Sequence, residues 1–286
     1  MPSRVKIIEC PRDAMQGLHE FIPTETKINY INSLIKCGFD TIDFGSFVSP
    51  KAIPQMRDTA DVLKGLDINE KTKLLAIIAN ERGATDACTF DEINYLGFPF
   101  SVSETFQQRN TNSSISDSLK NVDKIQNLAI KNNKELVVYL SMGFGNPYGD
   151  EWNADIVIKW CQVLYDKLGI KIQALSDTIG VASKESVSYL FKEIIPILPE
   201  VNFGAHLHTL PENAKGIIES AYNAGCRRFD SAIKGFGGCP MAKDDLTGNM
   251  PTELMLEWFS ENNIETGIND VIFKQSYEKA ITVFPK

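Results

Sequence analysis

The residues best placed to do chemistry are two histidines one position apart, His206 and His208, at the end of a short β-rich run. Successive side chains of a strand point to opposite sides, so the two imidazoles share one side, about 6.5–7 Å apart. That spacing lets both rings reach one metal ion from a rigid backbone. Taken alone, the pair also fits two histidines held by hydrogen bonds at a strand end, so further ligands must come from elsewhere.

Acidic residues lie at or just beyond the ends of other predicted strands. Arg12 and Asp13 come after the first β-rich run, which Pro11 interrupts. Asp43 belongs to the second run, and Asp177 follows the sixth. In isolation, Arg12 and Asp13 are typical of a surface ion pair in a loop, but their position makes them candidates for a site at the ends of the strands.

A glycine-rich loop over residues 235–240 carries Cys239 between Gly238 and Pro240. Glycines allow a loop to approach a site closely and to close over it. A thiol in such a loop can give or take a proton. A glycine-rich turn that happens to contain a cysteine is the alternative interpretation.

Composition describes an ordinary globular chain of 286 residues, 43% hydrophobic and 23% charged. The formal net charge of −8 argues against a nucleic acid or an anionic membrane as partner. No apolar run approaches the length of a membrane span, and the N-terminus lacks a signal-peptide core, so we expect a cytoplasmic protein. The six cysteines are scattered without Cys-x-x-Cys spacing, which predicts free thiols, most of them buried.

Strand-like and helix-like segments alternate along the whole chain. This alternation predicts a single (β/α)8 barrel over residues 1–286, with closing helices from about residue 251. An open doubly wound sheet is the alternative, but no Gly-x-Gly-x-x-Gly follows the first strand. The predicted strands are 5–10, 41–44, 73–78, 98–102, 136–142, 170–175, 202–207 and 228–233, and the predicted helices are 24–37, 58–65, 84–88, 114–131, 154–168, 184–194, 211–224, 251–260 and 269–281.

A barrel would bring Asp13, His206 and His208 together at the carboxyl ends of its strands, where barrel enzymes build their sites. Two imidazoles and a carboxylate suit a divalent ion that acts as a Lewis acid. The side-chain amide of Asn249 could add a fourth ligand. Oxygen-rich coordination favours Mg²⁺ or Mn²⁺ over structural zinc, so the sequence predicts one of these two ions.

Several of these segments resemble 3-hydroxy-3-methylglutaryl-CoA lyase, a branch of a wider superfamily of metal-dependent lyases and Claisen-type synthases. The resemblance runs in order from about residue 5 to residue 260. Ser-Phe-Val-Ser-Pro-Lys and Gly-Gly-Cys-Pro are specific to the lyase branch, whereas Arg-Asp and His-x-His are shared more widely. The matching segments are 9–13 with Gln16, 46–51, 54–56, 103–106, 177–180, 206–208, 237–240 and 248–249.

The resemblance implies cleavage of an acyl-CoA substrate, 3-hydroxy-3-methylglutaryl-CoA, to acetyl-CoA and acetoacetate. Arg12 would stabilise negative charge on the thioester oxygen, and Cys239 would help to protonate the enolate. Related barrels commonly form homodimers. The implied metal ligands are Asp13, His206, His208 and Asn249; the implied catalytic residues are Arg12, Asp13, Cys239, Asp43, Asp177 and His206; the implied substrate-binding residues are Arg12, Gln16, Ser46 and Lys51.

The sequence departs from the family pattern near these positions. Asp43 occupies a position where the family usually has a glutamate, and Asn146 occupies the position of a cysteine in the loop after the fifth strand. Further departures are Ala14-Met15, residues 17–19, Thr209 and one extra residue between Cys239 and Asn249. These changes leave the metal ligands intact and leave open which acyl-CoA is the substrate.

Two other functions remain open at this stage. One is a related aldolase or Claisen-type synthase that acts on another hydroxy acid or acyl-CoA, although such synthases usually carry a long C-terminal extension. The other is a non-catalytic barrel that binds a partner. The presence of Arg12, Asp13 and Cys239 together argues against a pure binding function.

Overall fold

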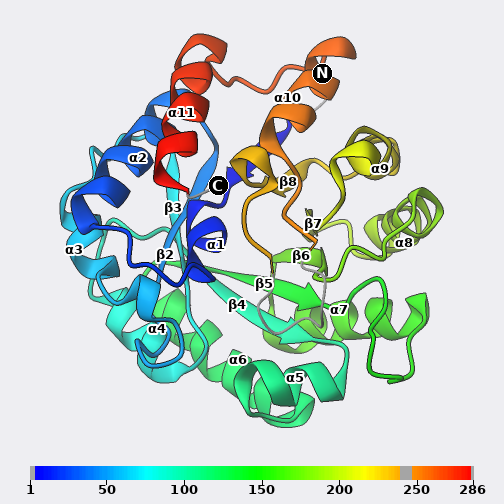
Figure 1. The fold of residues 1–286 in the computed structure, drawn as a ribbon. Coiled ribbons are helices and arrows are strands. Elements are labelled where there is room, and N and C mark those ends of the chain that lie inside the picture. The colour runs from blue at the N-terminus through cyan, green and yellow to red at the C-terminus, as the bar shows by residue number, and fades with distance from the viewer. Residues whose placement is uncertain (1–3, 239–246, 285–286) are drawn as a thin grey trace.

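The protein forms a closed barrel of parallel strands surrounded by helices (Figure 1). The computed structural model describes residues 4–238 and 247–284. Within this part of the chain, eight strands pair in sequence order and β8 closes against β1, so the predicted barrel is confirmed and the open sheet is wrong. The strands are β1 (Lys6–Glu9), β2 (Thr41–Ser46), β3 (Lys73–Ile77), β4 (Tyr95–Ser101), β5 (Glu135–Ser141), β6 (Ile172–Asp177), β7 (Asn202–Leu207) and β8 (Arg228–Ser231).

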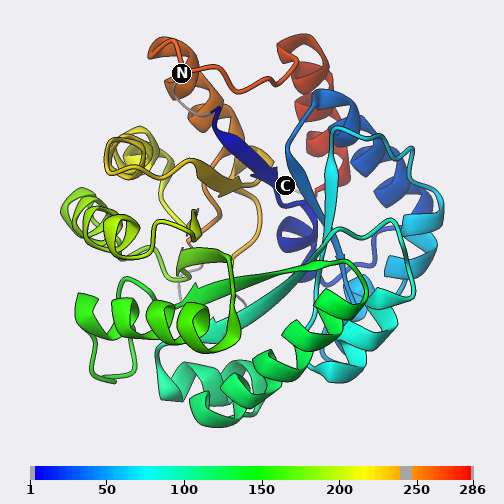
Figure 2. The ribbon, with the colours of Figure 1, turned by 180° about the vertical axis from the view of Figure 1, so that it is seen from behind.

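Helices cover the outside of the barrel on all sides (Figure 2). Their ends follow ordinary capping chemistry: α7 begins where the Asn153 side chain accepts from the backbone of Ile156, and it ends at left-handed Gly169. The described helices are α1 (Pro11–Gln16), α2 (Thr24–Cys37), α3 (Thr59–Lys64), α4 (Glu81–Cys88), α5 (Glu104–Thr111), α6 (Ile115–Lys131), α7 (Ala154–Leu168), α8 (Lys184–Ile197), α9 (Pro211–Asn223), α10 (Thr252–Glu261) and α11 (Asp270–Val283), with short 3₁₀ turns η1 (Pro54–Met56) and η2 (Ile233–Gly235).

The structure differs from the predicted elements in two instructive places. The segment after β1 is the short helix α1 instead of a loop, because Pro11 occupies its first turn, where a missing N–H costs nothing. Strand β4 starts at Tyr95, three residues before the predicted start. Gly97 lies in this added part, and a Cβ there would come within 2.5 Å of the Ile77 side chain, so glycine leaves room for the inward side chains of β3 and β5.

The interior of the barrel is divided into an apolar half and a polar half. A small apolar cluster, contributed mainly by β3, β5 and β6, fills one half. The polar half is formed by β2, β7 and β8, whose inward residues include Asp43, His206 and Asp230. The large hydrophobic core lies between the strands and the helices. The apolar cluster consists of Leu75, Ile77, Val137, Tyr139, Ile172 and Ala174.

The last two helices form the predicted C-terminal extension. Helix α11 packs along α2, next to the N-terminal third of the chain (Figure 1). Phe284 meets Tyr30 edge to face, with ring centroids 5.7 Å apart. In residues 4–238 and 247–284 we find no helix with the length and apolar character needed to span a bilayer. The described cysteines are all free thiols, as predicted, while Cys239 lies outside the described residues.

A buried glutamate ties β1 to the segment that precedes α10. Glu9 accepts hydrogen bonds from the backbone N–H of Ile233 at 2.9 Å and from the hydroxyl of Thr252 at 2.6 Å. Burial raises the pKa of Glu9 from 4.5 to about 8, against the opposing effect of these two donors. The native state therefore keeps a proton on Glu9 at pH values where the unfolded chain has lost it.

We expect the Glu9→Gln variant to change how stability depends on pH. Because the folded pKa is raised, the stability linked to Glu9 is present at low pH and is lost as the pH rises from about 5 to about 8. The free energy of unfolding of the wild type should fall across this window by roughly 2–4 kcal/mol relative to Glu9→Gln. Urea denaturation at several pH values measures this difference. Glu200→Gln, at an exposed glutamate, is the control, and equal pH slopes in all three proteins would contradict the prediction.

Candidate active site

A cavity of about 440 Å³ opens at the carboxyl ends of the strands. Its innermost walls carry buried polar residues, among them Arg12, Asp13, His206 and His208. Tyr139 from the apolar half of the barrel completes the floor. Enzymes with this fold place their active sites at this end of the barrel.

Asp13, His206 and His208 form a compact set of metal-ligating groups. One carboxylate oxygen and one nitrogen from each ring all lie within 4.8 Å of one another. The two imidazole centroids are 5.4 Å apart, and Leu207 between them packs into the core, as the alternation of a strand predicts. Their geometry and chemistry fit a divalent cation with nitrogen and oxygen ligands.

Asn249 lies directly beside this set. Its side-chain nitrogen Nδ2 donates to Asp13 Oδ2 at 2.7 Å and to the carbonyl of Phe236 at 2.9 Å. The side-chain oxygen is therefore the atom that Asn249 can offer to an ion. A Cβ at Gly237 would lie 2.8 Å from Asn249 Nδ2, so the glycine lets its loop approach the site.

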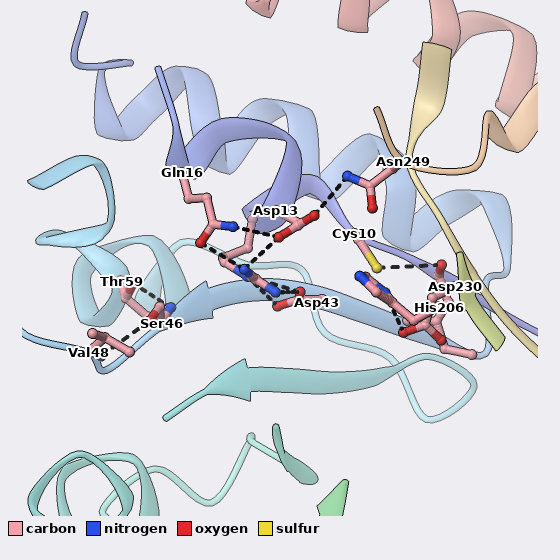
Figure 3. A network of polar contacts seen from close by, with 12 residues as sticks. Cys10, Asp13, Gln16, Asp43, Ser46, Val48, Thr59, His206, Asp230 and Asn249 are labelled. Atoms are coloured by element: carbon pink, nitrogen blue, oxygen red, sulfur yellow. Dashed lines mark hydrogen bonds and ion pairs between the residues drawn. The ribbon is translucent and has the colours of Figure 1, made fainter. Parts of the chain in front are cut away.

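Arg12 lies between the buried carboxylates of Asp13 and Asp43, both of which are labelled in Figure 3. Its Nε donates to Asp43 Oδ2 at 3.0 Å, and its Nη1 donates to Asp13 Oδ1 at 2.9 Å. Gln16 bridges the same groups, accepting from Arg12 and donating to Asp13. Burial would raise the pKa of Asp13, but Arg12 and the two histidines lower it. Burial raises the pKa of Asp43 to about 6, although Arg12 opposes the shift.

The two histidines have different electrostatic surroundings. Burial and the neighbouring His206 lower the pKa of His208 to about 4, so His208 is neutral at pH 7, the form that binds metals. His208 Nδ1 donates to the carbonyl of Thr247 at 3.0 Å, which directs Nε2 toward the other ligands. His206 Nδ1 lies 3.3 Å from Asp230, and this carboxylate raises the pKa of His206 against the effect of burial.

The buried charges of this region leave a surplus of negative charge. The guanidinium groups of Arg12 and Arg228 face the carboxylates of Asp13, Asp43 and Asp230. When both histidines are in the neutral form that binds a metal, two positive and three negative groups leave one net negative charge among these buried side chains. A buried net negative charge favours binding of a cation beside Asp13.

The family model described as HMGL-like matches residues 4–275, nearly the whole chain. The chain belongs to the HMGL-like family. It is 34% identical to hydroxymethylglutaryl-CoA lyase YngG of Bacillus subtilis, over 93% of this chain and 89% of that protein. It is 31% identical to 3-hydroxy-3-isohexenylglutaryl-CoA/hydroxy-methylglutaryl-CoA lyase of Pseudomonas aeruginosa, over 94% of this chain and 89% of that one.

Solved structures of the HMGL-like family share the fold throughout. An HMG-CoA lyase from Acinetobacter baumannii, in complex with coenzyme A and 3-methylmalate, gives a TM-score of 0.91 at 30% identity, covering 98% of this chain and 91% of that one. The Bacillus subtilis HMG-CoA lyase gives a TM-score of 0.90 at 33% identity, covering 97% of this chain and 92% of that one. Because the named relatives are lyases, the prediction of a carbon–carbon lyase and the family resemblance are both confirmed.

The structure brings some of the predicted HMGL-like site residues together and leaves others apart. Arg12, Asp13, Gln16, Asp43, His206, His208 and Asn249 form one connected cluster. Asp177 pairs with Leu207, so it points away from the barrel interior, and its carboxylate accepts backbone N–H groups of residues 179, 180 and 182. It therefore shapes the loop after β6 and does not line the cavity.

Ser46 and Lys51 also lie outside the cavity wall. Ser46 is buried next to Thr59 and accepts from the backbone N–H of Val48, apart from the Asp13 cluster (Figure 3). Lys51 is exposed on the following turn. The neighbouring residues Val48, Ala52 and Ile53 line the cavity instead, so this family segment contributes a wall rather than a polar contact.

Two departures from the HMGL-like pattern have a structural explanation. The shorter side chain of Asp43 still reaches Arg12 with both oxygens. Asn146 holds the loop after β5, because its oxygen accepts from the backbone N–H groups of Tyr148 and Asp150 and its nitrogen donates to the Asp150 carbonyl.

Sequence reasoning missed the residues that support His206. Asp230 accepts from His206 and is itself bound by Arg228 Nη1 at 2.9 Å. Cys10 completes a second group of potential ligands with His206 and Asp230. The sequence does contain a signal for Arg228 and Asp230. They alternate in the strand next to the one that leads to His206-x-His208, and Asp230 pairs with His206, so both patterns occupy inward positions.

We expect His208→Ala to abolish binding of Mn²⁺ at this site, because the variant loses one of three closely spaced ligands. Titration calorimetry with Mn²⁺ measures the effect, with an expected loss of affinity of about 100-fold or more. His19→Ala, at the third histidine of the chain, is the control and should bind Mn²⁺ as the wild type does. Normal Mn²⁺ binding by His208→Ala would remove this residue from the ligand set.

Proposed function

We propose that this protein cleaves 3-hydroxy-3-methylglutaryl-CoA to acetyl-CoA and acetoacetate in a metal-dependent reaction. The observation that carries the proposal is the close grouping of Asp13, His206 and His208 beside the buried guanidinium of Arg12. Membership of the HMGL-like family and the names of the relatives support the substrate. A family structure in complex with coenzyme A supports an acyl-CoA.

The residues that would hold the ion are Asp13, His206 and His208, with the side-chain oxygen of Asn249 as a further ligand. Mg²⁺ or Mn²⁺ fits a set that contains two oxygen donors and leaves room for water and substrate. When bound, the ion would supply positive charge that favours loss of the proton from the substrate's 3-hydroxyl. Asp13 is held ready for this role because Arg12, Gln16 and Asn249 fix both of its oxygens.

Arg12 would stabilise the negative charge that moves onto the thioester oxygen. Once the 3-hydroxyl is deprotonated, its electrons form the ketone of acetoacetate and the bond between C2 and C3 breaks. The electron pair of that bond passes to the acetyl-CoA fragment as an enolate. A guanidinium fixed by Asp43 and Gln16 would meet this charge without reorganisation, as an oxyanion hole does.

Cys239 would then protonate the enolate carbon, the role that the family resemblance implies. Because Cys239 lies outside the described residues, this part of the proposal depends on the sequence alone. Asp177 would act only indirectly, by shaping the loop that follows β6.

The predicted cytoplasmic location stays a prediction, since relatives are named as both cytoplasmic and mitochondrial forms. The predicted homodimer and the predicted lack of nucleic-acid partners stay predictions as well.

The proposal predicts release of acetoacetate from 3-hydroxy-3-methylglutaryl-CoA in the presence of Mg²⁺ or Mn²⁺ and a thiol reductant. Incubation with EDTA should remove the activity, and added ion should restore it. A coupled assay for acetoacetate measures turnover, and Asp13→Asn, which keeps the shape of the side chain, should lower it by about 100-fold or more. A folded protein that binds Mn²⁺ and releases no acetoacetate would contradict the proposed substrate.

A further inference from the structure

The cavity has a mouth that differs in chemistry from its floor. The floor is buried, whereas the lining residues Leu18, His19, Phe21 and Arg57 are half-buried or exposed. They come from the segment after α1 and from the end of η1, on one side of the opening. The same cavity therefore joins this group of residues to His208 at its floor.

Arg57 is held in place at the mouth. Its guanidinium carbon lies 3.5 Å from the centre of the Phe21 ring, which indicates a stacked cation–π contact. One further hydrogen bond runs from Nη1 to the carbonyl of Pro54 at 3.2 Å. That bond uses one of the five N–H groups of a guanidinium, so most of the planar donor fork remains available to a ligand.

No carboxylate in the described part of the chain forms an ion pair with Arg57. The neighbouring Asp58 is taken by the buried Lys27, with Nζ and Oδ1 2.7 Å apart. Arg12, the other arginine that lines the cavity, is held by Asp13 and Asp43. The chain has a net charge of −8, yet at the mouth of the cavity it holds a stacked guanidinium that forms no ion pair with any carboxylate of the described residues.

We infer that Arg57, stacked on Phe21, binds a phosphate group of the coenzyme A portion of the substrate. A planar guanidinium matches phosphate oxygens with two parallel hydrogen bonds, and stacking reduces the freedom that such a side chain would lose on binding. The inference rests on the proposed acyl-CoA substrate. It makes Arg57 a residue that selects coenzyme A thioesters over thioesters that lack the nucleotide.

Titration calorimetry with coenzyme A, dephospho-coenzyme A and pantetheine tests this inference without any turnover. Arg57→Ala should weaken binding of coenzyme A by about tenfold and leave binding of pantetheine unchanged. If Arg57→Ala and the wild type bind dephospho-coenzyme A equally well, Arg57 contacts the 3′-phosphate. If the variant binds dephospho-coenzyme A more weakly than the wild type does, Arg57 contacts the diphosphate. Phe21→Leu, which removes the aromatic face and keeps apolar bulk, should lose less affinity for coenzyme A than Arg57→Ala does.

Lys64→Ala is the control for net charge, because Lys64 is an exposed cation at the end of α3 that does not line the cavity. Its affinity for coenzyme A should equal that of the wild type. Equal affinities of Arg57→Ala and wild type for coenzyme A would overturn the inference. Equal losses of affinity for coenzyme A in Arg57→Ala and Lys64→Ala would also overturn it, because such losses would reflect the overall charge of the protein.

Kinetics separate this inference from the proposed function. With 3-hydroxy-3-methylglutaryl-CoA, Arg57→Ala should raise KM about tenfold and leave kcat unchanged, because the contact is the same in the ground state and the transition state. With the corresponding pantetheine thioester, wild type and variant should have the same kcat/KM. If coenzyme A binding depends on Arg57 but no acetoacetate forms, the proposed reaction fails and the phosphate contact stands.

Discussion

The position of Arg12 between Asp13 and Asp43 is the interaction on which the rest of the site depends. All three groups are buried, and a buried charge without a partner costs several kcal/mol. Arg12 satisfies both carboxylates at once, and Gln16 and Asn249 complete the hydrogen bonds of Asp13. The same contacts that allow the charges to be buried also fix Asp13 in the orientation that a metal ligand needs.

The barrel meets this constraint by dividing its interior. Parallel strands place neighbouring residues of the same register on the same side, so Ser176, His206 and Asp230 line up across β6, β7 and β8. On β1, Ile8 has the register of Asp230, and the helix that follows carries Arg12 and Asp13 toward the same region. The opposite half is filled by Tyr139 and its apolar neighbours. Chemistry and stability therefore depend on the same arrangement.

Most of the fold and part of the site could be predicted from the sequence. The prediction that His206 and His208 lie on the same side of their strand is correct, because the geometry of a strand backbone alone fixes the side to which each side chain points. Asp177 was grouped with the site because it ends a strand, yet its register with Leu207 turns it outward. Arg228 and Asp230 escaped notice because charged residues within a strand usually face solvent; only closure of the barrel buries them together. The helix α1 depends on tertiary position as well as on Pro11.

We propose that a divalent ion binds among Asp13, His206 and His208, and diffraction from a crystal soaked in Mn²⁺ tests this most directly. Anomalous scattering from manganese locates the ion without reference to activity. We expect a single strong peak within coordination distance of Asp13, of both imidazoles and of the Asn249 oxygen. A peak among Cys10, His206 and Asp230 instead, or no peak inside the barrel, would contradict it.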